Sequence, residues 1–161
     1  MWVRTASKRD IPAISLLLGQ VWHDTYDSIY GVEKVNAITA QWHSAKALAQ
    51  NLKKPGSEFL VADDGNMIAG TAFASQTEPA IAKLHQLYVL RQFQGRGVGK
   101  LLLEEFEDSF FEAQNLVLEV EALNEPAIQF YKKYGYAQTG ETANCGAEGS
   151  GIAALVFTKK R

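Results

Sequence analysis

The sequence predicts a single domain of the mixed-sheet α/β (α+β) class that spans residues 1–161. Strand patterns and helical patterns are interspersed along the chain, in the order strand, helix, helix, three strands, helix, strand, helix and two strands. The length suits one hydrophobic core of ordinary size. Neither an internal repeat nor a low-complexity linker divides the sequence, so we expect one domain.

The composition argues against nucleic-acid and membrane partners. Sixteen Lys and Arg residues stand against eighteen Asp and Glu, which gives a net charge of −2 and no basic field for an anionic polymer. No apolar run approaches the roughly 20 residues of a membrane helix, and no secretory signal pattern opens the sequence. The lone Cys145 cannot form an internal disulfide, which fits a reducing compartment. We therefore expect a soluble, cytoplasmic protein.

The first third of the chain is predicted to contain one strand and two helices. Residues 2–6 form a short strand pattern, and Ser7 and Asp10 can both cap a following helix. Residues 45–52 have a second helical pattern, and the aromatic stretch 23–44 is predicted to be a connection between the two helices. The first helix is predicted from apolar residues at helical spacing, namely Ile11, Ile14, Leu17, Leu18, Val21 and Trp22.

A hairpin and a central strand are predicted next. Residues 58–64 and 67–75 flank a turn that contains Asp64-Gly65, a typical hairpin signal. Residues 81–90 carry apolar side chains on both faces, as a central strand does. A glycine-rich turn then leads into a helix with a predicted buried stripe of Val98, Leu101, Leu102, Phe106 and Phe110.

The last third is predicted to be a strand, a short helix and two closing strands. Residues 115–122 have the strand pattern, and Asn124 can cap the helix that ends at Gly135. The segments 136–144 and 152–160 are the closing strands, joined by the glycine-rich loop 145–151.

The turn RQFQGRGVGK (91–100) combines three glycines with the start of a helix, an arrangement that suits an anion. A nucleotide-binding P-loop would need glycine at Gln94 and Ser or Thr at Leu101. The dinucleotide fingerprint would need glycine at Lys100. Both nucleotide interpretations fail on this spacing, while the anion interpretation stands.

Read as Gln94-x-x-Gly97-x-Gly99, the turn resembles the signature Q/R-x-x-G-x-G/A of the GCN5-related N-acetyltransferases (GNAT), which cradles the pyrophosphate of acetyl-coenzyme A. A second motif, NEPAIQFYKKYGY (124–136), is similar to the helix that lies on the other flank of the coenzyme in this family. The resemblance implies a central mixed, mostly antiparallel twisted sheet flanked by about four helices. It also implies acetyl-CoA as acetyl donor, with no metal.

The resemblance further implies which residues contact the coenzyme. Backbone N–H groups at the end of strand 81–90 would bind the pantetheine arm and stabilise the developing oxyanion, and the turn would bind the pyrophosphate. The implied residues are Leu87, Tyr88, Val89, Gln94, Gly95, Arg96, Gly97, Val98, Gly99, Lys100, Asn124 and Tyr131.

Catalytic roles follow from the same resemblance. Tyr131 matches the tyrosine that serves as general acid in many family members, and a phenol with a pKa near 10 is protonated at neutral pH. Glu119, twelve residues earlier, has a relation to Tyr131 similar to that of the glutamate in ribosomal-protein acetyltransferases, which makes it the first candidate for the base. Glu121 on the same strand face and His85 on the preceding strand remain alternatives.

The resemblance implies an acceptor site with aromatic walls, for which Trp22, Tyr26, Tyr30 and His85 are the candidates. Direct acetyl transfer to a primary amine in a ternary complex is the predicted function. A small-molecule amine, a polyamine and a peptide or protein N-terminus all remain open as acceptors. A coenzyme-sensing module without turnover is the alternative function, and the oligomeric state is open, with a homodimer as one option.

Overall fold

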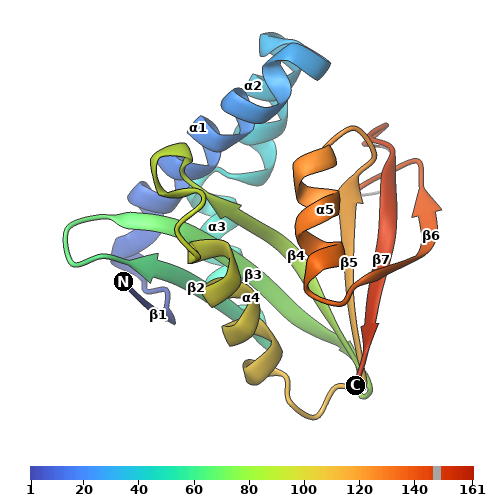
Figure 1. Ribbon diagram of the computed structural model, residues 1–161. Helices are drawn as coiled ribbons and strands as arrows, with labels where there is room; N and C mark the ends of the chain where they lie inside the picture. The colour runs from blue at the N-terminus through green and yellow to red at the C-terminus, as the bar shows by residue number, and fades with distance from the viewer. Residues whose placement is uncertain (147–149) are drawn as a thin grey trace. The chain divides into compact units, whose positions relative to one another are not determined.

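The computed structural model describes residues 1–146 and 150–161, and it confirms the mixed-sheet class (Figure 1). The strands are β1 (Trp2–Thr5), β2 (Ser57–Asp63), β3 (Ile68–Glu78), β4 (Ile81–Val89), β5 (Asn115–Glu121), β6 (Ala137–Thr142) and β7 (Ala154–Lys160). The described residues contain five α-helices, namely α1 (Ile11–Tyr30), α2 (Val32–Trp42), α3 (Ala45–Leu52), α4 (Val98–Ser109) and α5 (Glu125–Lys133). Two 3-10 turns, η1 (Lys8–Asp10) and η2 (Arg91–Phe93), precede α1 and α4.

The strands follow the order β1-β2-β3-β4-β5-β7-β6 in one mixed sheet. β4 and β5 are parallel, with Ile81 opposite Asn115 and Leu84 opposite Leu118, whereas β1 with β2, β5 with β7 and β6 with β7 are antiparallel. The predicted central position of β4 is confirmed, since it lies between β3 and β5. The glycine-rich loop predicted at 145–151 lies partly outside the described residues.

The chain folds into two compact units. Unit 1 comprises Met1–Ala74 and Gln86–Ser109, and unit 2 comprises Ser75–His85 and Phe110–Arg161. The strands β3 and β4 each run from one unit into the other. The single domain over 1–161 stays a prediction.

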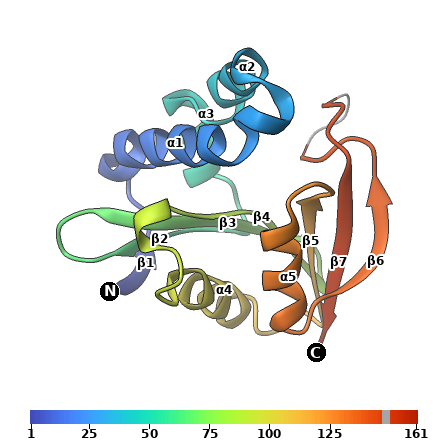
Figure 2. The ribbon, with the colours of Figure 1, turned by 45° about the horizontal axis from the view of Figure 1, so that its top comes forward.

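The core of unit 1 forms between α1 and the strands β2 and β3. In unit 1, helices α1 to α3 cover one face of the strands and α4 lies on the other face (Figure 2). All six residues of the predicted apolar stripe of α1 are buried, and five of them share one cluster with Leu48 of α3 and Phe59 of β2. Burying each such side chain stabilises the fold by about 1.5–3 kcal/mol.

The predicted connection over residues 23–44 is wrong, because most of it is helical. α1 continues to Tyr30, and α2 begins directly after Gly31, whose φ of 87° interrupts the helix. Aromatic rings four residues apart stack along α1, with Trp22 and Tyr26 centroids 4.5 Å apart and Tyr26 and Tyr30 centroids 5.6 Å apart. Such pairs support the continuation of α1 to Tyr30.

The predicted buried stripe of α4 is partly wrong. Leu101 is 39% exposed, whereas Leu103 is buried. The remaining buried residues of the helix, Val98, Leu102 and Phe106, agree with the prediction, while Phe110 lies beyond the end of α4. The buried face of the helix therefore includes Leu103 on one side of Leu102 in place of Leu101 on the other.

Unit 2 encloses a second set of buried apolar residues around β5. Leu116, Leu118 and Val120 alternate along the strand and are buried. Asn124 caps α5 by accepting a hydrogen bond from the Ala127 N–H at 3.3 Å, and Gly135, with φ 94°, follows the end of the helix. The predicted cap and stop of this helix are both present.

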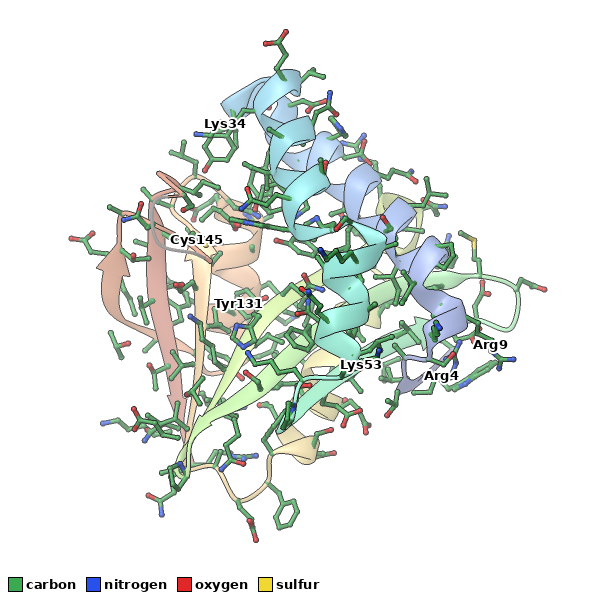
Figure 3. The ribbon with its side chains drawn as sticks, turned by 180° about the vertical axis from the view of Figure 1, so that it is seen from behind. Arg4, Arg9, Lys34, Lys53, Tyr131 and Cys145 are labelled. Carbon is green, nitrogen blue, oxygen red and sulfur yellow. The ribbon has the colours of Figure 1, made fainter. Side chains whose placement is uncertain are left out.

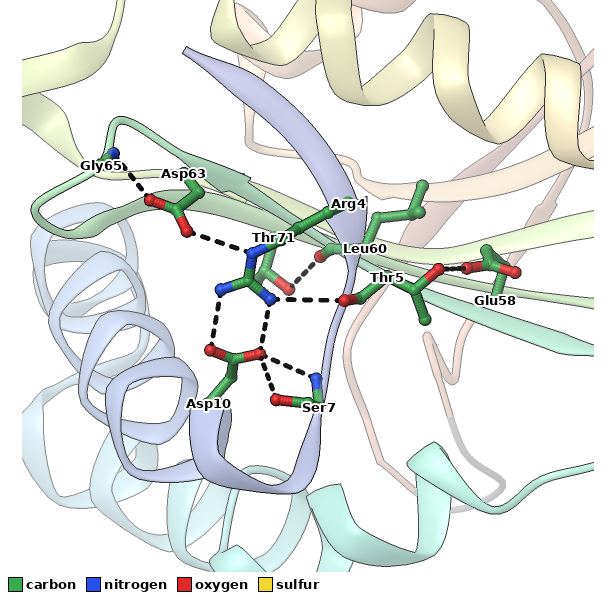
Figure 4. A network of polar contacts seen from close by, with 9 residues as sticks. All are labelled: Arg4, Thr5, Ser7, Asp10, Glu58, Leu60, Asp63, Gly65 and Thr71. Carbon is green, nitrogen blue, oxygen red and sulfur yellow. Dashed lines mark hydrogen bonds and ion pairs between the residues drawn. The ribbon is translucent and has the colours of Figure 1, made fainter.

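A polar network at the N-terminus holds β1, η1 and β2 together (Figure 4). The Arg4 guanidinium donates to both carboxylate oxygens of Asp10, at 2.8 and 3.0 Å, and to Asp63 at 3.1 Å. Asp10 also accepts from the Ser7 N–H and hydroxyl, and it is buried. Arg4 holds the pKa of the Asp10 carboxyl well below its usual range, followed in effect by the Ser7 bonds, although burial acts in the opposite direction.

Replacing Asp10 with Asn should lower the free energy of unfolding by about 2–3 kcal/mol at pH 7, because a half-buried guanidinium loses one of its two charged partners. The folded pKa of Asp10 is depressed, so its contribution is complete above the unfolded pKa of about 3.9 and is lost as the pH falls further. Urea unfolding of both proteins between pH 7 and pH 2.5 would measure this. A stability difference that does not shrink below pH 4 would contradict it.

Candidate active site

The glycine turn of unit 1 forms a cradle at the start of α4. Gly95 and Gly97 both adopt left-handed backbone conformations, with φ 75° and 81°. Open space lies where a Cβ would extend from either residue, with no atom within 4 Å. The Gly97 carbonyl accepts from the Leu101 N–H at 3.0 Å, so the N–H groups of the first helical turn have no carbonyl partner within the helix. This arrangement suits an anion bound by backbone N–H groups and the positive end of the helix dipole.

The side chains of the turn have separate tasks. The Gln94 amide donates to the Val89 carbonyl at 3.0 Å, which ties the turn to the end of β4. The Arg96 guanidinium lies 5.7 Å from the centre of the Phe93 ring, and Lys100 is paired with Glu104 at 3.7 Å on the exposed side of α4. Val98 is buried and offers only its backbone to a ligand. Gly99 lies within the first turn of the helix.

The end of β4 lies against a glycine that sequence reasoning missed. A Cβ on Gly70 of β3 would lie 2.9 Å from the Tyr88 carbonyl oxygen and 3.0 Å from Leu102 Cδ1. The Leu90 N–H donates to the Ala69 carbonyl at 2.9 Å, so β3 supports the strand end through backbone contacts. A glycine inside a strand is the signal of such a close approach, and it is present in the sequence. Leu87 and Tyr88 are half-buried, and Val89 is buried.

Replacing Gly70 with Ala should lower the free energy of unfolding by about 1–3 kcal/mol, because the new methyl group would overlap the Tyr88 carbonyl and Leu102. Gly19→Ala in α1 is the matched control, since nothing lies within 4 Å of its Cβ position. In a helix interior that change should raise stability by about 0.5–1 kcal/mol. Urea unfolding measures both, and a stable Gly70→Ala protein would contradict the close packing.

Tyr131 lies on α5 in unit 2 (Figure 3). It is 8% exposed, and its ring makes edge contacts with Phe130 and Tyr136 at centroid distances of 5.1 and 5.9 Å. Burial raises the pKa of the Tyr131 phenol well above its usual range, and the nearby Glu121 carboxylate raises it further. The phenol is therefore protonated at neutral pH, as a general acid must be.

The three candidate bases lie in unit 2 and differ in their surroundings. The Glu119 carboxylate pairs with Lys83 Nζ at 3.4 Å, while Glu121 is 7% exposed. His85 is exposed, and its Nε2 lies 2.7 Å from the Ser75 hydroxyl. The choice of base among these three residues stays open. Each side chain can take up a proton, and each already interacts with a neighbouring group.

Cys145 is not suited to nucleophilic chemistry. Its side chain is buried, and burial raises the pKa of the thiol to about 12, with further increases from the Glu121 and Glu119 carboxylates and a smaller opposing effect of Lys83. A thiol with such a pKa holds almost no thiolate at neutral pH.

The aromatic residues predicted for the acceptor gather in unit 1, except for His85. Trp22 lies at the centre, with ring centroids 4.5 Å from Tyr26 and 6.0 Å from Trp42. Trp22 and Tyr26 are fully buried, whereas Tyr30 is half-buried, with Lys34 Nζ 5.0 Å from the centre of its ring. Their role in binding an acceptor stays a prediction.

Unit 2 contains a hollow of about 320 Å³ that sequence reasoning did not anticipate. It lies at the ends of β5 and β6 and the start of β7, and Glu141 is its charged residue. The lining residues are Ala122, Glu141, Thr142, Ala143, Ala153, Ala154 and Leu155. Residues of β6 and β7 and of the segments next to them line it, and this depends on sheet pairing rather than on any local motif.

Within 1–146 and 150–161, no group of three or more His, Cys, Asp or Glu residues could hold a metal ion. The helices of the described residues include none with the length and apolar character needed to cross a bilayer. The expected cytoplasmic location stays a prediction.

Residues 26–153 match the family model described as the acetyltransferase (GNAT) domain. The chain belongs to the GNAT family. The match contains both motifs, the turn at Gln94 to Gly99 and the segment 124–136, so the predicted family is confirmed.

Two curated proteins are similar in sequence to parts of this GNAT chain. N-alpha-acetyltransferase RimI from Mycobacterium tuberculosis is 31% identical over 97 residues, which cover 58% of this chain and 61% of the relative. The similarity thus spans about three fifths of that relative's length. An uncharacterized N-acetyltransferase from Bacillus subtilis, YuaI, is 24% identical over 144 residues, covering 86% of this chain and 82% of the relative.

Solved structures share the fold at low sequence identity. PaiA N-acetyltransferase from Thermoplasma acidophilum, crystallised in complex with coenzyme A, superposes with a TM-score of 0.86 at 22% identity, covering 99% of this chain and 98% of that one. The ribosomal-protein-S18-alanine N-acetyltransferase from Escherichia coli superposes with a TM-score of 0.73 at 20% identity, covering 98% and 92%. The predicted GNAT-like sheet is confirmed by this likeness.

Proposed function

We propose that this GNAT chain is an acetyl-CoA-dependent N-acetyltransferase that moves an acetyl group directly to a primary amine. The turn of unit 1 carries the proposal, because its left-handed Gly95 and Gly97 leave open space in front of the first turn of α4. A pyrophosphate is the anion that acetyl-CoA would present to such a cradle. The coenzyme A complex of PaiA, a protein of the same fold, supports the choice of donor.

The proposed coenzyme contacts divide into backbone and side-chain contributions. N–H groups of Leu87, Tyr88 and Val89 would bind the pantetheine arm and stabilise the oxyanion that develops on the thioester carbonyl. Gln94 would hold the turn in position through its bond to β4. The N–H groups of the turn and first helical turn would bind the pyrophosphate, with Arg96 and Lys100 adding positive charge, through residues Gly95, Arg96, Gly97, Val98, Gly99 and Lys100.

The chemistry needs one acid and one base. The neutral amine nitrogen attacks the thioester carbonyl, the carbon–sulfur bond breaks, and Tyr131 donates its proton to the leaving thiolate. A carboxylate or imidazole removes the proton that the amine nitrogen loses, and Glu119, Glu121 and His85 are the candidates. Asn124 supports this arrangement by fixing the start of the helix that carries Tyr131.

Two assays test the proposal together. Calorimetry with acetyl-CoA and with CoA tests the donor, and release of free CoA tests transfer to a panel of small amines, polyamines, amino-acid amides and peptide N-termini. The name of the RimI relative places peptide N-termini first in the panel. Absence of binding at millimolar coenzyme would overturn the proposal. Binding without CoA release on every acceptor would favour the coenzyme-sensing module instead.

A further inference from the structure

Among the residues that the structure describes, three buried side-chain nitrogens of unit 1 have no hydrogen-bond partner. They are Trp22 Nε1, His43 Nδ1 and Gln86 Nε2. Trp22 is 2% exposed and His43 is 4% exposed, so solvent does not satisfy these atoms. Leaving one such group unpaired costs about 1–3 kcal/mol, and buried polar groups in folded proteins almost always have partners. Three unpaired buried nitrogens in one unit indicate a site that can receive a hydrogen-bonding oxygen of a ligand.

The three side chains belong to one neighbourhood. The Trp22 ring centroid lies 5.8 Å from that of His43 and 6.2 Å from that of Tyr88. Gln86 precedes Tyr88 by two residues on β4, so both side chains point to the same face of the strand. The Ser15 hydroxyl of α1 donates to the His43 carbonyl at 2.7 Å, which fixes the end of α2 against α1.

The nitrogens offer hydrogen-bond donors rather than positive charge. Indole and amide nitrogens carry N–H groups and cannot accept. Burial lowers the pKa of His43 to about 4, so its ring is neutral at physiological pH and can donate or accept according to tautomer. The ligand that fits is an uncharged oxygen with two lone pairs.

Half-buried side chains separate these donors from solvent. Trp42, Gln86 and Tyr88 are each partly exposed, and the buried Trp22 ring contacts those of Trp42 and Tyr88 at centroid distances of 6.0 and 6.2 Å.

We infer that Trp22, Gln86 and His43 form a subsite for the carbonyl oxygen next to the acceptor amine. This inference rests on the proposed function and narrows its acceptor to a peptide N-terminus or an amino-acid amide. A carbonyl satisfies the indole and amide donors at once. A polyamine carries only N–H donors and cationic nitrogens, so it would leave Trp22 and Gln86 unpaired.

The test compares acceptors in which a carboxamide group is replaced by an ethyl group. Alaninamide and sec-butylamine have the same branching at the carbon that bears the amine, and only alaninamide has the carbonyl. Rates of CoA release, corrected for the neutral fraction of each amine, should give a kcat/KM at least about tenfold higher for alaninamide than for sec-butylamine or spermidine. Equal values, or a preference for the alkylamine or the polyamine, would overturn the inference.

Variants then test whether Gln86 and Trp22 cause the preference for alaninamide. Gln86→Leu and Trp22→Phe remove one donor each and should lower kcat/KM for alaninamide about 10- to 100-fold more than for sec-butylamine, mainly through KM. Gln50→Leu on the exposed side of α3 and Trp2→Phe on β1 make the same chemical changes elsewhere and should alter neither acceptor.

The outcomes separate this inference from the proposed function. Equal loss for both acceptors in the variants would overturn the carbonyl subsite while the acetyltransferase proposal stands. Absence of CoA release with every acceptor would overturn both. If Trp22→Phe lowers the melting temperature too far to assay, the half-buried Gln86→Leu decides alone.

Discussion

Replacing Tyr131 with Phe is expected to lower kcat for acetyl transfer by roughly 100- to 10,000-fold, the usual contribution of a general acid. The phenol is buried and its pKa is raised, so it holds its proton at neutral pH and can donate it to a thiolate. Phe retains the ring that packs on Phe130 and Tyr136. The affinity for acetyl-CoA should therefore remain close to that of the unaltered protein.

Steady-state kinetics with calorimetry separates these effects. Tyr134→Phe, at the end of the same helix, is the matched control and should keep full turnover. Because the folded pKa of Tyr131 is raised, loss of the acidic proton should not limit the rate below about pH 10. Full turnover of the Tyr131→Phe protein would remove this residue from the acid role.

Replacing Gly97 with Ala should weaken acetyl-CoA binding by roughly 10- to 100-fold. Gly97 adopts φ 81°, which costs an alanine about 1–2 kcal/mol. Its Cβ would also extend into the open space in front of the turn, where we place the pyrophosphate. The substitution thus adds backbone strain and obstructs the anion at the same position.

Gly31→Ala separates the two contributions. Gly31 has φ 87° and open space around its Cβ position, and it lies between α1 and α2 rather than in the turn. Gly31→Ala should lose at least as much free energy of unfolding in urea as Gly97→Ala, because φ 87° with ψ 150° is open essentially only to glycine. Only Gly97→Ala should bind acetyl-CoA more weakly by calorimetry. Equal affinity of the two variants would contradict a pyrophosphate at the glycine turn.

Local signals in the sequence were sufficient for the features that depend on a few neighbouring residues. Asn124 and Gly135 indicate the start and stop of α5, and both positions carry the expected cap and left-handed glycine. The glycine spacing after Gln94 distinguishes the turn from nucleotide-binding loops, and the family match agrees. Helix caps and left-handed turns depend on interactions among four or five neighbouring residues, so they can be predicted directly from the sequence.

Local patterns failed where side chains of distant segments decide the outcome. Residues 23–44 lack a regular aliphatic stripe, yet most of the stretch is helical, and the Trp42 ring of α2 packs against Trp22 of α1 at a centroid distance of 6.0 Å. Leu103, rather than Leu101, faces the interior, because the packing of α4 on the sheet sets its rotation. Spacing alone cannot show which of two apolar residues on either side of a buried position is itself buried.

The sequence by itself determined the family, the succession of strands, and the turn that leads into α4, since each depends on short-range spacing and backbone preference. Only the tertiary structure decided that Gly70 lies against the Tyr88 carbonyl, that Asp10 is buried under Arg4, and that donors of Trp22, His43 and Gln86 lie unpaired in one neighbourhood. These features join segments between six and 64 positions apart in the chain. Burial and hydrogen-bond satisfaction depend on which segments meet, and chain folding alone brings them together.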